Sequence, residues 1–212
     1  MTGARDSVLG AVRQHLRRSS DGPVAAPPPV PLLGRVDLAV QERLEQFAER
    51  LRGVGGELHL GLDDGGFAAV RTLLTRFAPK SIATSDAPAV IALQQRTELA
   101  SQPWLPANAS LEALFAADLG VTTAQWGIAE TGTLVLDSAH ERHRLASLLP
   151  PVHIALLPAS RVLCHMGEVL KTLDRPLSCA VTFVTGPSRT ADIELKLIVG
   201  VHGPRELHVV VV

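Results

Sequence analysis

Residues 126–138 of the chain read Trp126-Gly127-Ile128-Ala129-Glu130-Thr131-Gly132-Thr133-Leu134-Val135-Leu136-Asp137-Ser138. The second half of this stretch is apolar and β-branched, which is the composition of a buried strand. The first half places a carboxylate, threonine hydroxyls and two glycines before that strand, and Gly127 and Gly132 permit a sharp turn with exposed amides. The stretch therefore predicts either a polar binding loop on a rigid strand or a plain hairpin turn with a solvated Glu130.

The composition of the chain argues against several classes of protein. The 212 residues, 46% of them hydrophobic, are enough for one large α/β domain or two small ones. Aromatic residues make up only 3% and tyrosine is absent, so there are few platforms on which single-stranded nucleic acid could stack. A net charge of -1 gives no general attraction for nucleic acid or anionic membranes. We therefore expect no nucleic-acid partner.

The cysteines and the N-terminal residues bear on cofactors and location. Cys164 and Cys179 form no CxxC motif, cannot supply the four thiolates of an iron–sulfur cluster, and do not suggest a secreted disulfide framework. The first 20 residues are charged and lack the apolar core of a signal peptide. No apolar run is long enough to span a bilayer. These features predict a cytoplasmic protein with no membrane span and no cofactor bound by this chain.

Periodicity divides the chain into two parts. Apolar residues at helical spacing predict an amphipathic helix over residues 4–18, and prolines make residues 21–31 a linker or strap. We therefore predict an N-terminal helix and strap over 1–31 and a single α/β domain over 32–212, with a mainly parallel sheet flanked by helices. The expected helices are 36–52, 67–77, 111–117 and 159–173, and the expected strands are 57–62, 81–84, 121–125, 132–136, 152–157, 180–184 and 207–212.

A second polar segment follows the strand expected at 180–184, and it reads Thr185-Gly186-Pro187-Ser188-Arg189-Thr190-Ala191-Asp192-Ile193-Glu194. Open α/β sheets bind their ligands after strands, and Ser188 or Thr190 can cap a helix there. Amides at a helix start together with the Arg189 guanidinium form a site for phosphate or carboxylate. The alternative is an ordinary capped helix in which Arg189 pairs with Asp192 or Glu194.

Histidines supply the remaining candidates. His202 lies in the tight loop Gly200-Val201-His202-Gly203-Pro204, where it can act as acid, base or hydrogen-bond donor, or can simply bond its own turn. His140 and His143 face the same way on a helix but lack a third ligand, so a solvated helix start is favoured and no metal site is predicted. P-loop, dinucleotide-binding and serine-nucleophile motifs are missing.

Taken together, the segments 127–136, 186–194 and 200–204 resemble the LUD domain and, within it, the lactate-utilisation protein C family. The resemblance implies a fold similar to the group of ribose-5-phosphate isomerase, glucosamine-phosphate deaminase and coenzyme A transferase. It also implies a role in oxidising L-lactate to pyruvate beside two iron–sulfur partner proteins, with the iron–sulfur clusters on those partners. By analogy of fold, Glu130 is similar to the glutamate of a coenzyme A transferase turn, although an asparagine would be expected at Thr131.

The resulting hypothesis is a lactate-utilisation subunit that binds a small anionic ligand at the carboxyl ends of its strands. The catalytic candidates are Glu130 and His202, and Arg189 is the expected anion clamp. The other ligand-binding candidates offer hydroxyls, amides or a carboxylate: Thr131, Gly132, Thr133, Gly186, Ser188, Thr190 and Asp192. Two alternatives remain open, namely a non-enzymatic assembly subunit whose N-terminal helix and strap hold the partners, and a stand-alone acyl or phospho-sugar enzyme. Whether the chain is itself catalytic also remains open.

Overall fold

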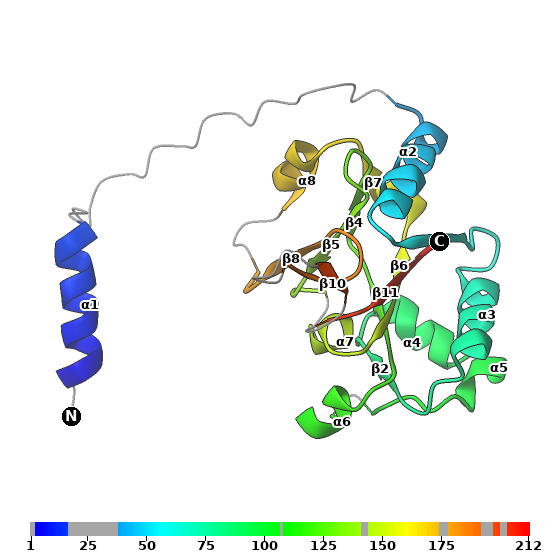
Figure 1. The fold of residues 1–212 in the computed structure, drawn as a ribbon, viewed down its shortest axis with the longest axis horizontal. Helices are drawn as coiled ribbons and strands as arrows, with labels where there is room; N and C mark the ends of the chain where they lie inside the picture. The colour runs from blue at the N-terminus through cyan, green and yellow to red at the C-terminus, as the bar shows by residue number, and fades with distance from the viewer. Residues whose placement is uncertain are drawn as a thin grey trace. The chain divides into compact units, whose positions relative to one another are not determined.

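Figure 1 shows the fold of the computed structural model, which describes residues 3–16, 38–106, 108–140, 144–173, 178–191, 197–199 and 203–212. The chain divides into two compact units, Met1–Pro31 and Leu32–Val212, and each is described by itself. In the first unit, helix α1 (Gly3–Leu16) exposes the apolar side chains of Val8 and Val12. The proline-rich strap predicted over residues 21–31 lies outside the described residues.

The second unit is built on a parallel sheet of five strands. In chain order they are β1 (Glu57–Leu60), β2 (Ile82–Thr84), β3 (Leu119–Thr123), β6 (Val152–Leu157) and β11 (Glu206–Val211). Their order in the sheet is β1-β11-β6-β3-β2, and every neighbouring pair is parallel. Every residue of β6 is buried, as expected for a strand that is covered on both faces of a parallel sheet.

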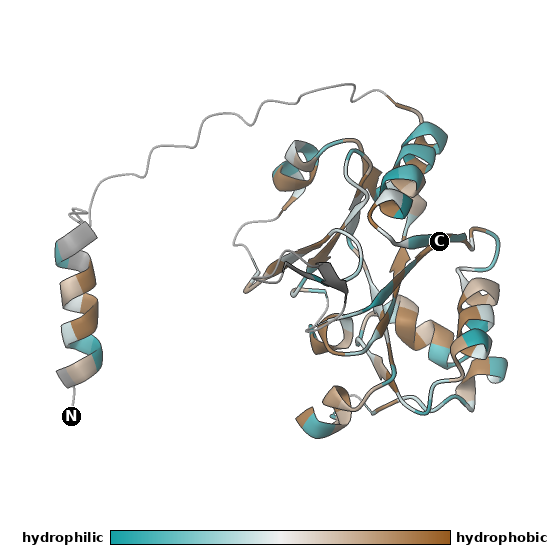
Figure 2. Ribbon diagram, viewed as in Figure 1, coloured by the Kyte–Doolittle hydropathy of each residue, from teal (hydrophilic) through white to brown (hydrophobic). Residues whose placement is uncertain are grey.

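Helices cover both faces of this sheet. Successive strand residues point to opposite sides, so the apolar strands present side chains to be buried on both faces. Ile154 and Leu156 of β6 pack in one core cluster with residues of α3 (Phe67–Phe77) and α4 (Pro88–Gln94). Ala155 and Leu157 pack in another with residues of α2 (Val40–Gly53). In Figure 2 these helices carry both hydrophilic and hydrophobic residues, as packing of a single face requires. The shorter helices of this unit are α5 (Thr97–Ala100), α6 (Leu111–Phe115), α7 (Leu145–Leu148) and α8 (Met166–Thr172).

A smaller mixed sheet contains the polar and apolar stretch of residues 126–138. Its strands are β4 (Trp126–Ile128), β5 (Thr133–Asp137), β7 (Val162–Leu163) and β8 (Val181–Val184), in the order β7-β4-β5-β8. β4 and β5 form an antiparallel hairpin. Gly132 in its turn has φ +66°, and a Cβ there would lie 2.3 Å from the backbone nitrogen of Leu51. The hairpin therefore needs glycine at this position to pack against α2.

The predicted fold class is confirmed: the chain is α/β, with a parallel sheet flanked by helices. Two local predictions are wrong. Residues 159–173 do not form one helix, because β7 pairs with β4 and only a 3-10 turn, η1 (Ala159–Arg161), and α8 are helical. No helix begins at Ser188 or Thr190, because β9 (Arg189–Ala191) pairs with β10 (Leu197–Val199) in a two-stranded antiparallel ribbon. Among the described residues, no helix has the length and apolar character needed to cross a membrane.

Candidate functional site

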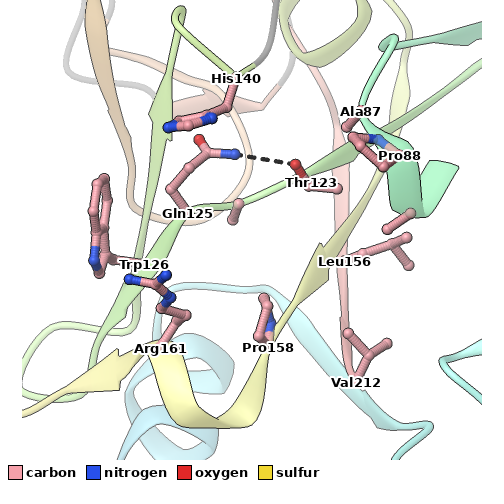
Figure 3. Close-up of a pocket in the computed structure, with 12 residues that line it drawn as sticks. Ala87, Pro88, Thr123, Gln125, Trp126, His140, Leu156, Pro158, Arg161 and Val212 are labelled. Carbon is pink, nitrogen blue, oxygen red and sulfur yellow. Dashed lines mark hydrogen bonds between the residues drawn. The ribbon is translucent and has the colours of Figure 1, made fainter.

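A pocket of about 380 Å³ opens where the parallel strands end (Figure 3). Residues at or just after the ends of β2, β3, β6 and β11 line it, which is where open α/β sheets bind their ligands. Its lining consists of Ala87, Pro88, Ala89, Thr123, Ala124, Gln125, Trp126, His140, Leu156, Pro158, Arg161 and Val212. The volume lies within the usual range for a small-molecule site, about 300–1,000 Å³.

Gln125 is held in a fixed orientation at the junction of the two sheets. The chain passes there directly from β3 to β4. The Gln125 Oε1 accepts a hydrogen bond from the Asp137 amide at 2.6 Å, and its Nε2 donates to the Thr123 Oγ1 at 3.0 Å. An amide nitrogen has two protons, so the second Nε2 proton is left for a ligand in the pocket.

The pocket is lined by one guanidinium, that of Arg161, and by the His140 imidazole. Arg161 ends η1, and His140 follows β5; both are exposed. Among the residues that the structure describes, none forms a hydrogen bond or ion pair with the side chain of either. The described lining residues include no carboxylate. A guanidinium binds carboxylates and phosphates through paired hydrogen bonds, so this arrangement favours an anion.

Several apolar lining residues lie apart from the polar ones, while Trp126 lies beside Arg161 (Figure 3). Figure 3 shows Gln125, His140 and Arg161 toward one side of the pocket, and Ala87, Pro88, Leu156 and Val212 toward the other. A ligand with an anionic end and an apolar end therefore has a complementary surface for each.

The loops predicted to form the site are in contact with one another. They meet next to the end of α2 and do not line the pocket. Thr131 and Thr133 share a hydrogen bond of 2.7 Å, and Thr133 shares another of 2.8 Å with Thr185. These hydroxyls connect the hairpin turn to the segment after β8. The amide of Ser188 donates to the carbonyl of Pro204 at 2.7 Å, which places the second and third predicted loops side by side.

Glycine and arginine in these loops pack on the last turn of α2. Gly186 has φ +81°, and a Cβ there would lie 2.6 Å from the carbonyl oxygen of Val54. The exposed Arg189 donates to that same oxygen at 2.7 Å. A cation that bonds a carbonyl at the C-terminus of a helix stabilises the helix end. This contact gives Arg189 a structural role, and its role as an anion clamp stays a prediction.

Glu130 is engaged by the start of α8. Its carboxylate oxygens contact the His165 Nδ1 at 2.7 Å and accept a hydrogen bond from the Met166 amide at 3.0 Å. Partial burial alone would raise the pKa of Glu130, but the bonds from Met166 and His165 outweigh it, so the pKa lies below its ordinary value. Glu130 is therefore ionised at neutral pH. Its acid–base role also stays a prediction.

Other predicted residues are only partly described. His202 and Asp192 lie outside the described residues, as does the side chain of Thr190. None of the predicted site residues that the structure describes lines the pocket. Sequence reasoning missed Arg161 because it was assigned to the first turn of the helix predicted over 159–173. It also missed Gln125, although the position of Gln125 at the end of a predicted strand was a usable signal.

Comparisons with known proteins agree with this architecture. The sequence profile of the LUD domain matches residues 96–212. Lactate utilization protein C of Exiguobacterium sp. is 34% identical over 180 residues, which cover 79% of this chain and 78% of that protein. The homologue of the same name from Halalkalibacterium halodurans is 44% identical over 103 residues, and the match covers 45% of this chain and 44% of that protein. The crystal structure of a DUF162 family protein from Deinococcus radiodurans has the same fold, with a TM-score of 0.60 at 24% identity over 82% of this chain and 98% of that one.

Proposed function

Because this chain belongs to the LUD domain family, and within it to the lactate utilization protein C family, we propose that it is a subunit of a system that oxidises L-lactate to pyruvate. In this proposal its pocket binds the small carboxylate that the system handles. One observation carries the proposal: the Arg161 guanidinium and the His140 ring stand at the carboxyl ends of the strands, and no carboxylate is found among the lining residues that the structure describes.

The pocket offers complementary groups for each part of lactate or pyruvate. Arg161 binds the carboxylate through paired hydrogen bonds. Gln125 donates its second Nε2 proton to the hydroxyl or keto oxygen, because its other groups are occupied by Asp137 and Thr123. The apolar side of the pocket takes the methyl group. A hydrogen bond to a charged group contributes about 1.5–3 kcal/mol, so Arg161 accounts for at least about tenfold in affinity.

The electrons removed from lactate leave through partner proteins in this proposal. A chain with two cysteines cannot supply the four thiolates that an iron–sulfur cluster usually takes. We therefore place the clusters on the iron–sulfur lactate-utilisation proteins that the family resemblance implies. This chain then holds the substrate or product while the partners carry the electrons.

Calorimetric titration with L-lactate and with pyruvate tests the pocket. Arg161→Ala should weaken binding of the tighter of the two acids by about tenfold or more. Arg189→Ala is the matched control, because Arg189 is also an exposed guanidinium but bonds to the end of α2. If the control loses affinity and Arg161→Ala keeps it, the site lies at the predicted loops instead. Unchanged affinity in both variants would refute an arginine clamp anywhere in these segments.

An assembly role is the second candidate, and α1 is the observation that favours it. Its Val8 and Val12 side chains are 63% and 48% exposed, so the helix presents apolar surface to a partner. Deletion of residues 1–31 separates the two roles. An assembly subunit loses its iron–sulfur partners in co-purification and keeps acid binding, whereas a substrate-binding subunit that docks through its α/β domain keeps both.

A further inference from the structure

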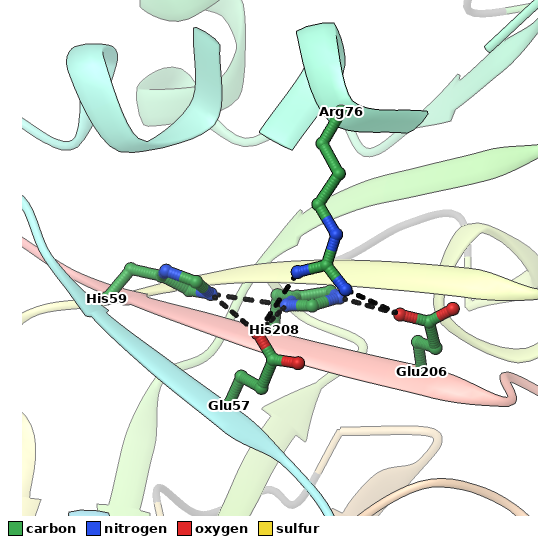
Figure 4. Close-up of polar contacts among 5 residues, drawn as sticks. All are labelled: Glu57, His59, Arg76, Glu206 and His208. Atoms are coloured by element: carbon green, nitrogen blue, oxygen red, sulfur yellow. Dashed lines mark hydrogen bonds and ion pairs between the residues drawn. The ribbon is translucent and has the colours of Figure 1, made fainter. Parts of the chain in front are cut away.

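A cluster of two histidines and a glutamate lies on β1 and β11, the edge strand of the parallel sheet and its neighbour (Figure 4). Glu57 and His59 are the first and third residues of β1, and His208 is the third residue of the neighbouring β11. The parallel register pairs Glu57 with His208. Because alternate strand residues point to the same face, all three side chains project from one side of the sheet.

The three ligand-type atoms are spaced like the corners of a metal site. The His59 Nε2 lies 3.1 Å from the His208 Nδ1, the His208 Nδ1 lies 3.4 Å from the Glu57 Oε2, and the His59 Nε2 lies 3.8 Å from that same oxygen. Zinc bonds of roughly 2.0–2.2 Å in tetrahedral geometry separate neighbouring ligands by about 3.4 Å. A small divalent ion therefore fits among these atoms with little movement of the side chains.

We propose that Glu57, His59 and His208 bind a Zn²⁺ ion, with a fourth coordination position open to water or a ligand. Two imidazoles and one carboxylate are the ligand set of several zinc sites that keep such an open position. The cluster occupies the first three residues of β1 and of β11, whereas the pocket is lined at and beyond the carboxyl ends of β2, β3, β6 and β11. The metal site is therefore separate from the proposed lactate pocket.

The surroundings of His208 favour the tautomer that a metal requires. Its side chain is 1% exposed, and its Nε2 lies 3.4 Å from the Glu206 Oε2 but makes no hydrogen bond within the described part of the chain. A proton on Nε2 directed at Glu206 leaves the lone pair of Nδ1 for the metal. In many zinc sites a carboxylate orients a ligating histidine in this way, by accepting a hydrogen bond from the ring nitrogen that does not bind the metal.

Arg76 is the group that competes with the metal. Its guanidinium lies 3.3 Å from the Glu57 Oε2 and 3.7 Å from the Glu206 Oε2. Figure 4 shows it reaching down from α3 to the two carboxylates. The Arg76 side chain is 52% exposed, so it can turn to solvent or keep its contact with Glu206 when Zn²⁺ takes the Glu57 oxygen. A neighbouring cation weakens metal binding, so removal of this arginine should strengthen it.

The test is calorimetric titration of untagged, EDTA-treated full-length protein with ZnCl₂ alone. We expect about one Zn²⁺ per chain in a saturable isotherm. His59→Ala and Glu57→Gln should each weaken binding by more than about tenfold, and Arg76→Gln should tighten it. Both ligand positions are partly exposed, so these variants preserve the fold better than replacement of the buried His208. His140→Ala, an exposed histidine elsewhere, is the control and should bind Zn²⁺ as the wild type does.

Cobalt provides a second measurement. Co²⁺ in place of Zn²⁺ should give the intense visible absorption of a four-coordinate site, lost in His59→Ala. The proposal is overturned if no saturable Zn²⁺ binding is seen, if His59→Ala and Glu57→Gln bind as tightly as the wild type, or if His140→Ala alone abolishes binding. The cluster is then an ion-pair network centred on Arg76.

Discussion

Lowering the pH from about 7.5 to about 5 should destabilise the folded protein by about 2 kcal/mol through a single side chain, His153. This residue lies in the middle of the parallel sheet, on β6, and is fully buried. One ring nitrogen, Nε2, shares a hydrogen bond of 2.8 Å with the Thr122 hydroxyl, while Nδ1 has no hydrogen-bond partner among the described residues. A proton added to the ring would therefore place a charge and an unpaired N–H group in the core.

The magnitude follows from the pKa. Burial, with a smaller effect from His208, lowers the pKa of His153 from 6.5 to about 4. The unfolded chain then binds a proton at His153 more readily than the folded protein does. The contribution of His153 to the free energy of unfolding is therefore fully present above pH 6.5 and is lost as the pH falls from 6.5 toward 4. At about 1.4 kcal/mol per pH unit, the full loss is about 3 kcal/mol, of which about 2 kcal/mol has occurred at pH 5.

Urea unfolding of the wild type and of His153→Gln at both pH values isolates this contribution. Glutamine cannot titrate, and every other histidine is the same in the two proteins, so the wild type should lose about 2 kcal/mol more than the variant. The ring resonances of His153 in the folded wild type should also show no titration at pH 5.5 and above. Equal losses in the two proteins, or a ring that titrates near 6.5, would refute the reasoning.

Three further predictions concern the loops that were expected to form the site. Gly132→Ala should lower the free energy of unfolding by at least about 2 kcal/mol, because Gly132 has a left-handed backbone and an added Cβ would collide with α2. Gly53→Ala, whose added Cβ would meet nothing within 4 Å, should change that free energy by less than about 1 kcal/mol. Thermal and urea unfolding compare the two variants. Thr133→Val should cost about 1–3 kcal/mol in the same assay, because it leaves the Thr131 and Thr185 hydroxyls without the neighbour that they share. A cost no greater than that of Thr75→Val, at an exposed position on α3, would contradict this. Glu130→Gln should be less stable than the wild type at pH 6, because the folded protein lowers the pKa of the Glu130 carboxyl and so favours its charged form. The difference in free energy of unfolding should shrink as the pH falls through the pKa of Glu130 in the folded protein. A difference that does not change with pH would show that the charge of Glu130 is not what stabilises the turn.

Elements whose pattern is local could be predicted from the sequence. The helix at 67–77 and the strand at 152–157 have the predicted bounds, because their periodicity and flanking residues determine them. The segment 159–173 could not be predicted in the same way. Its apolar spacing fits a helix, but Val162 and Leu163 gain backbone hydrogen bonds and burial by pairing with β4, and that partner is distant in the sequence.

The candidate sites illustrate the same limit. The three predicted loops do meet, through Thr133, Thr185 and Ser188. Of the side chains chosen for chemistry, Glu130 bonds to the start of α8 and Arg189 to the end of α2, and His202 lies outside the described residues. The pocket depends on how the strand ends converge, and the metal cluster brings together His59 and His208, which are 149 residues apart. β1 and β11 both begin with glutamate, leucine and histidine. These residues form a cluster only because the register of the two strands pairs Glu57 with His208, and the register cannot be read from either segment alone.

The position of β11 between β1 and β6 has a consequence for biosynthesis. Among the described strands, β1 pairs only with β11, so its backbone groups have no sheet partner until residues 206–211 have left the ribosome. Contacts between such distant segments close slowly. The nascent chain therefore carries an unpaired β1 edge through most of translation, and this edge is where a chaperone would bind or where two unfinished chains would aggregate.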